Sequence, residues 1–303
     1  MTLQQCKYVL KISEVGSFNE AARQLFIAQS GLSSSVKLLE EELDIKIFER
    51  SKNGVTLTAE GAEFLRYAEG LVAQAEFVSE RYSRGDDKDR LHISTQHYDF
   101  IADVFCRFIG LAQAREYDMS LEEKRTYEVI HDVEIGLSEL GIIAVKKNDF
   151  DVMMRYLQAK DIEFSEFLNT PPHLFVKNTH PLAVKERISY DVLRGYPYVA
   201  YDQGEFNNSS LFTEEISVDV PPGKRITISD RATLMNVLLK TDCYTVGTGI
   251  MPSELNSGKI VSIPIETEEK YIVGYIEKRS KVRYPIANRF IDMLGEYARE
   301  LKE

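Results

Sequence analysis

The chain has 303 residues, of which 44% are hydrophobic and 28% are charged, and its formal net charge is −11. This length predicts two or three compact units, and the composition excludes a mostly disordered chain. Residues 1–7 lack the basic and apolar stretches of a signal peptide, and no apolar run approaches the roughly 20 residues that cross a bilayer. We therefore expect a cytoplasmic protein without a membrane partner.

The acidic residues are unevenly distributed. Residues 1–85 contain ten Lys and Arg and twelve Asp and Glu, a balance of −2, whereas the remainder carries −9. Nucleic-acid binding requires a locally basic or polar surface. If the N-terminal part binds DNA, its acidic side chains must lie away from the contact face.

The three cysteines, Cys6, Cys106 and Cys243, are far apart and form no C-x-x-C pair. This pattern predicts reduced, packed thiols. Because no cluster of His accompanies them, we expect no metal ion and no cofactor.

The first 58 residues predict three short helices and a hairpin. Residues 3–15 carry apolar side chains at helical spacing and are followed by Gly16, a typical C-cap. Residues 17–20 (Ser-Phe-Asn-Glu) have the form of a capping box that begins a second helix. A third helix follows residues 26–29. Its core-facing side chains recur at spacings of four, three and four: Leu32, Val36, Leu39 and Leu43.

A small hairpin is predicted after the third helix. Residues 45–48 and 55–57 are apolar or alternating, and residues 53–54 form an Asn-Gly pair, the preferred turn of a two-residue hairpin. This hairpin would form the wing of a winged helix-turn-helix.

A long helix is predicted from Thr58 to about residue 84. Its apolar side chains recur at spacings near 3.5, the coiled-coil period, so the helix requires a partner and predicts a homodimer. Residues 83–89 form a polar hinge. The apolar side chains are Phe64, Leu65, Ala68, Leu71, Val72, Ala75, Val78 and Tyr82, and Tyr67 and Phe77 are expected in the same dimer core.

From residue 90 onward, short apolar strands alternate with helices, which predicts parallel-rich sheets in two lobes. The expected strands are residues 91–95, 141–145, 174–176, 198–200, 226–228, 244–246 and 271–276. Helices are expected at residues 100–111, at 233–239 and from 286 onward.

Several short segments resemble the DNA-binding signature of LysR-type transcriptional regulators. They are residues 18–25 (Phe-Asn-Glu-Ala-Ala-Arg-Gln-Leu), 28–29, 32–33, 38–40, 48–50 and 57–61. Residues 180–183 and 188–190 also resemble a recurrent stretch of that family's second lobe. The chain departs from the family at Ser30, where Pro is frequent, at Asp44, where Gly is frequent, and at Leu140, where an acidic residue is common. The last departure predicts a different pocket chemistry.

The resemblance implies an α/β chain with three parts. These are a winged helix-turn-helix at residues 1–58, a dimerisation helix and hinge at 59–89, and a two-lobed domain like a type 2 periplasmic binding protein at 90–303. Lobe I is expected at about 90–161 and 268–303, and lobe II at about 162–267. The implied partners are double-stranded promoter DNA, a small-molecule effector, further copies of the chain in a dimer or tetramer, and RNA polymerase.

The third helix carries the candidate base contacts. A recognition helix presents its N-terminal side chains to base edges in the major groove. Gln29 can bind adenine N6 and N7, while Ser30, Ser33 and Ser34 are short enough for close approach to bases or phosphate. Lys37 suits a phosphate. The alternative is an ordinary solvated helix face.

The hairpin carries the candidate backbone contacts. Arg50, Lys52 and Asn53 would contact phosphates or the minor groove, which fixes register rather than sequence. Alternatively, Arg50 forms a structural ion pair with Glu49 or Glu42, and Lys52 is a solvated turn residue.

Residues 94–98 end the first strand of the second unit just before a helix. Ligands of open α/β sheets bind beyond the carboxyl ends of strands, and helix N-termini favour anions. The resemblance makes this turn part of the effector site, and an amino acid, a sulfur compound or a small organic anion is the expected ligand. The expected effector-binding residues are Thr95, Gln96, His97, Tyr201, Asp202, Gly247 and Thr248.

Two other functions compete with a regulator. A small-molecule-binding protein that captures a transported solute would share the two-lobed fold, but it is opposed by the N-terminal helix-turn-helix. An enzyme on this scaffold is opposed by the lack of a nucleophile elbow, a phosphate loop or a metal-ligand cluster. His97 as a catalytic base lacks an activated Ser or Cys motif, and residues 247–249 (Gly-Thr-Gly) lack the third glycine of a dinucleotide site. We therefore expect no catalytic activity.

Overall fold

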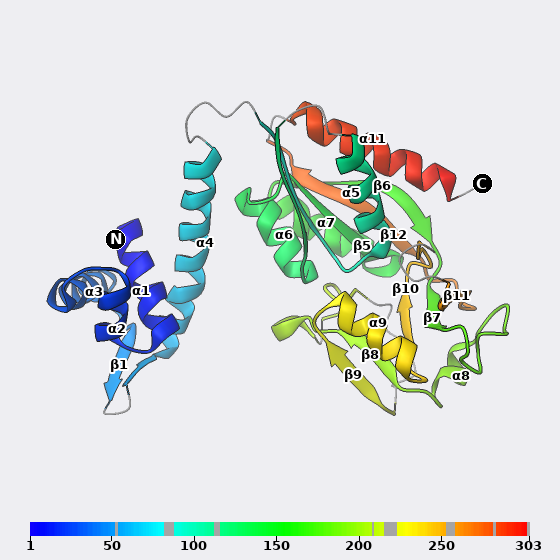
Figure 1. Ribbon diagram of the computed structural model, residues 1–303, viewed down its shortest axis with the longest axis horizontal. Coiled ribbons are helices and arrows are strands. Elements are labelled where there is room, and N and C mark those ends of the chain that lie inside the picture. The colour runs from blue at the N-terminus through cyan, green and yellow to red at the C-terminus, as the bar shows by residue number, and fades with distance from the viewer. Residues whose placement is uncertain are drawn as a thin grey trace. The chain divides into compact units, whose positions relative to one another are not determined.

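The computed structural model describes residues 1–51, 54–81, 88–111, 116–207, 209–214, 223–252, 258–280 and 283–301, without the side chains of residues 50, 51, 77, 80 and 81. The chain divides into two compact units, Met1–Asp86 and Asp87–Glu303 (Figure 1). No helix within these ranges combines the length and the apolar character that crossing a bilayer requires.

The first unit has the winged helix-turn-helix architecture that the sequence predicts. Its elements are α1 (Leu3–Val15), α2 (Phe18–Gln24), α3 (Gln29–Leu43), β1 (Phe48–Ser51), β2 (Gly54–Leu57) and α4 (Ala59–Arg81). The two strands pair antiparallel. The side chains at the centre of the core are fully buried: Val9, Ile12, Leu32, Leu39 and Ile47.

Local signals set the helix boundaries of this unit. Gly16 ends α1 in the left-handed conformation, with φ of 65°. The Ser17 side chain accepts a hydrogen bond from the N–H of Glu20 and begins α2. The Glu20 carboxylate is bonded to later side chains of α2, so only one half of the predicted capping box forms. The Thr58 hydroxyl accepts from the N–H of Gly61 at 2.8 Å and begins α4.

The apolar stripe of α4 is divided between two environments. Phe64, Ala68 and Val72 are buried in the core of their own unit, where α4 packs along α1. The prediction that the whole stripe faces a partner chain was therefore wrong, because α1 covers part of it. Three large apolar side chains of α4 remain exposed: Tyr67, Leu71 and Val78. Tyr82 lies outside the described residues, as does the side chain of Phe77.

The first lobe of the second unit is built on a five-stranded sheet of order β4-β3-β5-β12-β6. The strands are β3 (Asp89–Thr95), β4 (Tyr117–Glu123), β5 (Leu140–Lys146), β6 (Ile162–Thr170) and β12 (Tyr271–Lys278), and the helices are α5 (Asp99–Leu111), α6 (Thr126–Ile135), α7 (Phe150–Ala159) and α11 (Pro285–Glu300). Strand β5 shows the two-residue period of a sheet that is covered on both faces. Ile142 and Ala144 pack with α5 and α11, whereas Ile143 and Val145 pack with α6 and α7.

The second lobe contains two short ladders. Its strands are β7 (His173–Lys177), β8 (Tyr198–Tyr201), β9 (Arg225–Ile228), β10 (Thr245–Gly247) and β11 (Ile260–Pro264), with α8 (Tyr190–Leu193) and α9 (Arg231–Lys240). Strand β7 pairs antiparallel with β10 and β11, and β8 pairs parallel with β9. A single bridge between Tyr198 and Tyr244 connects the two ladders.

Two expectations about the second unit require correction. Strand β6 pairs with β12 along its length, so it belongs to the first lobe, and the boundary expected after residue 161 moves to residues 171–172. The sheets are also less parallel than expected, since β12 runs antiparallel to both β5 and β6. The reason is that β6 leaves the first lobe and β12 returns to it beside β6. The leaving and returning connections are bonded to each other, with the N–H of Ile265 donating to the carbonyl of Pro172 at 3.1 Å.

Candidate DNA interface and ligand cavity

The outward face of α3 carries the side chains that we expected to read DNA. Gln29, Ser30, Ser34 and Lys37 are exposed, and Ser33 is half-buried. Leu32, Val36 and Leu39 of the same helix are buried in the core, whereas Leu38 is exposed. The structure therefore brings the five predicted residues together on one helix, and their contact with DNA stays a prediction.

The N-terminus of α3 differs from those of the other helices of this unit. Its N-cap is Ala28, which offers no side-chain hydrogen bond, and its first turn contains no acidic residue. The N-termini of α1 and α2 are capped by Thr2 and Ser17. The first N–H groups of a helix carry partial positive charge and bind anions such as phosphate. In α3 neither the N-cap side chain nor an acidic side chain of the first turn competes for this role.

The acidic run that ends α3 is neutralised within the chain. Glu40 accepts hydrogen bonds from the N–H groups of Ile47 and Phe48 at 2.8 and 3.2 Å. Glu41 lies 3.3 Å from the ammonium of Lys37, and Glu42 contacts the amino group of residue 1. These contacts reduce the repulsion that the run would exert on a phosphate backbone.

The hairpin is attached to α4 by a close backbone contact. A Cβ on Gly61 would lie 2.0 Å from the carbonyl oxygen of Ile47, so only glycine fits there. The N–H of Thr58 donates to the same carbonyl at 3.1 Å. Asp44 precedes the hairpin with φ of 53°, a left-handed conformation that Asp tolerates better than most residues. The chain thus accommodates Asp where the family often has Gly.

The three candidate residues of the hairpin can be placed only in part. Arg50 lies on β1 opposite Val55 of β2. Its side chain lies outside the described residues, as do Lys52 and Asn53. Their roles stay predictions.

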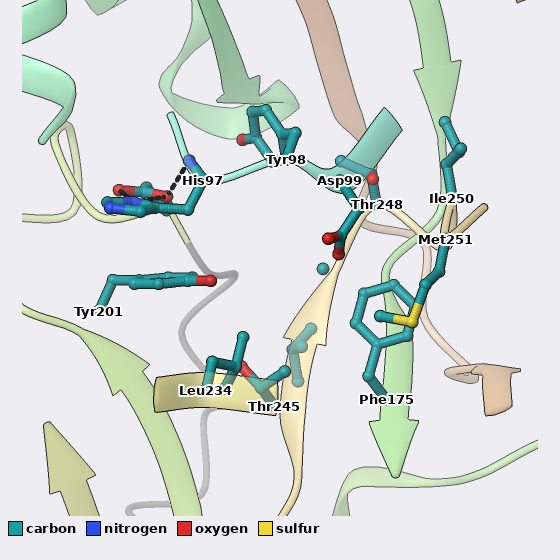
Figure 2. Close-up of a pocket in the computed structure, with 13 residues that line it drawn as sticks. His97, Tyr98, Asp99, Phe175, Tyr201, Leu234, Thr245, Thr248, Ile250 and Met251 are labelled. Atoms are coloured by element: carbon teal, nitrogen blue, oxygen red, sulfur yellow. Dashed lines mark hydrogen bonds and ion pairs between the residues drawn. The ribbon is translucent and has the colours of Figure 1, made fainter. Parts of the chain in front are cut away.

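The second unit contains a cavity of about 40 Å³ between its two lobes (Figure 2). Its lining comes from the turn between β3 and α5, from β7, β8 and β10, and from α9. The lining includes His97, Asp99, Phe175, Tyr201, Glu214 and Thr248. A more open hollow of about 400 Å³ adjoins it and shares Thr248, Ile250 and Met251.

His97 is held firmly at one side of this cavity. Its Nδ1 lies 3.0 Å from the Glu214 carboxylate, and its ring stacks on Tyr201 with centroids 4.0 Å apart and an interplanar angle of 10°. Figure 2 shows the rings of His97 and Tyr201 facing each other. An imidazole that is bonded and stacked in this way provides a fixed surface for a ligand.

Asp99 directs its carboxylate into the cavity (Figure 2). Arg231 at the start of α9 lies 2.8 Å from Asp99 and 2.9 Å from Glu123 at the end of β4. Burial raises the pKa of both carboxyl groups, and the guanidinium of Arg231 offsets part of that effect. This ion triad connects the first lobe to the second.

The other predicted effector residues divide into two groups. Gly247 and Thr248 line the cavity, as predicted. Thr95 and Gln96 are fully buried and absent from its lining, and the Gln96 side chain is bonded to Thr126, Tyr98 and the N–H of Ala144. Asp202 also lies outside the lining and forms an ion pair with Arg125. Contact of these three residues with an effector stays a prediction.

Sequence reasoning missed several lining residues. Phe175, Leu234 and Met251 are apolar residues on a strand, a helix and a loop, where their types suggest only core packing. Glu214 lies near the end of a segment without a clear periodic pattern. Among these missed residues, Asp99 could have been found from the sequence, because it directly follows residues 94–98, the strand end that we assigned to the effector site.

Two family models match the chain. A model described as a bacterial regulatory helix-turn-helix protein of the lysR family matches residues 3–62. A model described as a LysR substrate binding domain matches residues 124–299.

Known relatives cover nearly the whole chain. The uncharacterized HTH-type transcriptional regulator YbhD of Escherichia coli is 24% identical over 301 residues, which cover 96% of this chain and 90% of that protein. The transcriptional dual regulator GltC of Bacillus subtilis is 24% identical and covers 100% of this chain and 99% of its own length. The crystal structure of CbnR, a LysR family transcriptional regulator, is similar with a TM-score of 0.63 at 17% identity, covering 98% of this chain and 99% of that one.

Proposed function

The chain belongs to the LysR family of DNA-binding transcriptional regulators with an effector-binding domain, and from this premise we propose that α3 reads promoter DNA in the major groove. The observation that carries the proposal is the exposed polar face of α3 behind an uncapped helix N-terminus. Gln29 and Ser34 would contact bases, and Lys37 would contact phosphate. Arg50, Lys52 and Asn53 of the hairpin would contact the DNA backbone.

The exposed apolar side chains of α4 support a homodimer in this proposal. Tyr67, Leu71 and Val78 follow one another at helical spacings of four and seven. A second copy of α4 would cover them, and the two α3 helices would then read half-sites related by dyad symmetry. Pairs of such dimers would form a tetramer. RNA polymerase is the proposed downstream partner, and the cytoplasm is the proposed site of action.

The cavity beside His97 is the proposed effector site. A volume of about 40 Å³ holds only a few water molecules, since each requires roughly 10–15 Å³. A larger effector would therefore bind a more open arrangement of the lobes, and its differential affinity for that arrangement would shift the population. We propose that the protein acts through this shift rather than through catalysis, because the described lining residues include no Ser or Cys that His97 could activate as a nucleophile.

The charges around the cavity favour an effector with an amino group. Asp99 and Glu214 are both in the lining, where Asp99 is paired with Arg231 and Glu214 with His97, and among the described lining residues themselves there is no Lys or Arg to receive an anion. The first turn of α5, which would otherwise favour a carboxylate, already contains Asp99. Of the ligands expected from the sequence, an amino acid fits this lining better than a simple organic anion.

The DNA proposal is tested by selection from a random-sequence duplex library with the full chain. We expect enrichment of a duplex with two half-sites of approximate dyad symmetry, and loss of that preference in the Gln29→Ala and Ser34→Ala variants. The proposed effector site is tested by thermal shift with pairs of small molecules that share a carbon skeleton and differ in carrying an amine or a carboxylate. A bound ligand raises the melting temperature, so we expect the amines to raise it more than the carboxylates. Enrichment without symmetry, or stabilisation by the carboxylates alone, would contradict the respective proposal.

A further inference from the structure

Phe26 occupies an unusual position in the turn between α2 and α3. Its side chain is 95% exposed, the highest value among the exposed large hydrophobic residues of the described chain. Its φ is 55°, in the left-handed region. The residues on either side, Leu25 and Ile27, are half-buried and pack against the core of the unit.

The fold itself does not require a phenylalanine here. A single exposed apolar side chain is ordinary, but a bulky aromatic residue with positive φ is a conformational outlier. Glycine would adopt the same backbone without strain, and asparagine would do so at little cost. The turn therefore combines backbone strain with an exposed ring, and strain of this kind is characteristic of functional sites.

The surroundings of Phe26 indicate what the ring contacts. It lies three residues before Gln29, and Arg23, Gln24 and Ser30 near it in the chain are also exposed. Protein interfaces present contiguous apolar patches, whereas this ring stands among polar neighbours. The apolar stripe suited to a second copy of the chain is on α4.

We propose that Phe26 is a DNA-contacting residue, whose ring packs against apolar atoms of the duplex beside the first turn of α3. Thymine methyl groups and deoxyribose carbons provide such atoms at the edge of the major groove. The inference rests on the proposed function of α3, and it adds an aromatic contact to a surface that is otherwise polar. Because the ring neutralises no phosphate, its contribution is independent of salt concentration.

The test compares Phe26→Gly with Asp44→Gly in the full chain. Both substitutions place glycine at a left-handed position, before α3 in one case and after it in the other. We expect both to raise the thermal melting temperature, because both relieve backbone strain. Only Phe26→Gly should weaken binding to the selected duplex, by about tenfold, the scale expected for burying much of an aromatic ring. Phe26→Tyr should restore the affinity.

Two further measurements define the contact. The slope of log K against log salt concentration should be the same for Phe26→Gly and the unsubstituted chain. The second measurement replaces thymine by uracil in the duplex. If the ring packs on a methyl group, this change should weaken binding of the unsubstituted chain but not of Phe26→Gly. If the ring packs on deoxyribose, it should affect neither.

Three results would overturn the inference. The first is an unchanged DNA affinity in Phe26→Gly. The second is a lower melting temperature or a changed oligomeric mass, which would show that the ring is covered by protein. The third is failure of the unsubstituted chain to enrich any duplex, which would refute the proposed function itself and is recognised before any variant is made.

Discussion

The carboxylate of Glu214 contacts both the backbone N–H and the imidazole of His97, at 3.1 and 3.0 Å. His97 follows β3 of the first lobe, whereas Glu214 belongs to the segment that follows β8 of the second. Gln203 donates a further hydrogen bond to Glu214 at 2.8 Å. A buried polar cluster thus connects the lobes beside the proposed effector cavity.

Removing the Glu214 carboxylate should loosen this connection. We expect Glu214→Ala to lower the free energy of unfolding of the second unit by about 1–3 kcal/mol, because the buried N–H of His97 loses its acceptor. Glu214→Gln keeps an acceptor oxygen and should lose less. Hydrogen exchange at the amide of His97 measures the local effect directly. If this amide were as well protected in Glu214→Ala as in the unsubstituted chain, the contact would be unimportant.

The raised pKa of Asp99 predicts a specific dependence on pH. Burial raises this pKa above its ordinary value, so the unfolded chain releases the proton at a lower pH than the folded chain does. The contribution of Asp99 to stability therefore falls as pH rises from the ordinary value near 4 through the raised one. Glu123 responds in the same sense, since its pKa is also raised by burial.

Asp99→Asn should remove the Asp99 part of this pH dependence. Urea midpoints measured from pH 4 to pH 7 should show the variant gaining stability relative to the unsubstituted chain as pH rises. Asp118→Asn, at a carboxylate that is 60% exposed, serves as the control for replacing an aspartate by asparagine. Parallel curves for Asp99→Asn and the unsubstituted chain would contradict the assignment.

Base contacts and phosphate contacts on α3 should separate in binding experiments. Gln29→Ala should relax the preference for one base position by about 1–3 kcal/mol. Lys37→Ala should weaken binding to all duplexes alike and reduce the salt slope by about 1. Competition and salt titrations measure the two effects. The reverse pattern would mean that the roles of the two residues are exchanged.

The contact between Gly61 and the hairpin should tolerate no side chain. Gly61→Ala places a Cβ 2.0 Å from a backbone oxygen that cannot move without displacing the hairpin. We expect a loss of at least about 1–3 kcal/mol in unfolding free energy. Gly31→Ala, where a Cβ meets nothing within 4 Å, is the control and should be neutral or stabilising. Chemical denaturation of both variants decides between these outcomes.

The first unit was largely predictable because each of its elements carries a local signal. Gly16 and Ser17 mark helix boundaries, and the apolar spacing of α3 identifies its outward face. The environment of α4 was less predictable. A periodic stripe shows that a helix has an apolar partner, but Val72 and Leu71 carry the same signal although only the former is buried by α1.

The lining of the proposed effector cavity was predictable only in the segment that follows a strand end. The segment after β3 contributes His97 and Asp99 to the lining, yet the Gln96 side chain packs into the core, and which side chains face the cavity depends on the exact end of the strand. Phe175 and Glu214 reach the cavity from segments that are distant in sequence. Their participation follows from how the two lobes pack, which no local pattern records.

The hydrogen bond between Ile265 and Pro172 has a mechanical consequence. The two connections between the lobes run side by side, so they define a single axis, and the lobes can rotate about it more easily than they can slide. Displacement in such a rotation grows with distance from the axis. We therefore expect an effector that enlarges the cavity to open the angle between the two lobes, and a larger ligand to open a larger angle.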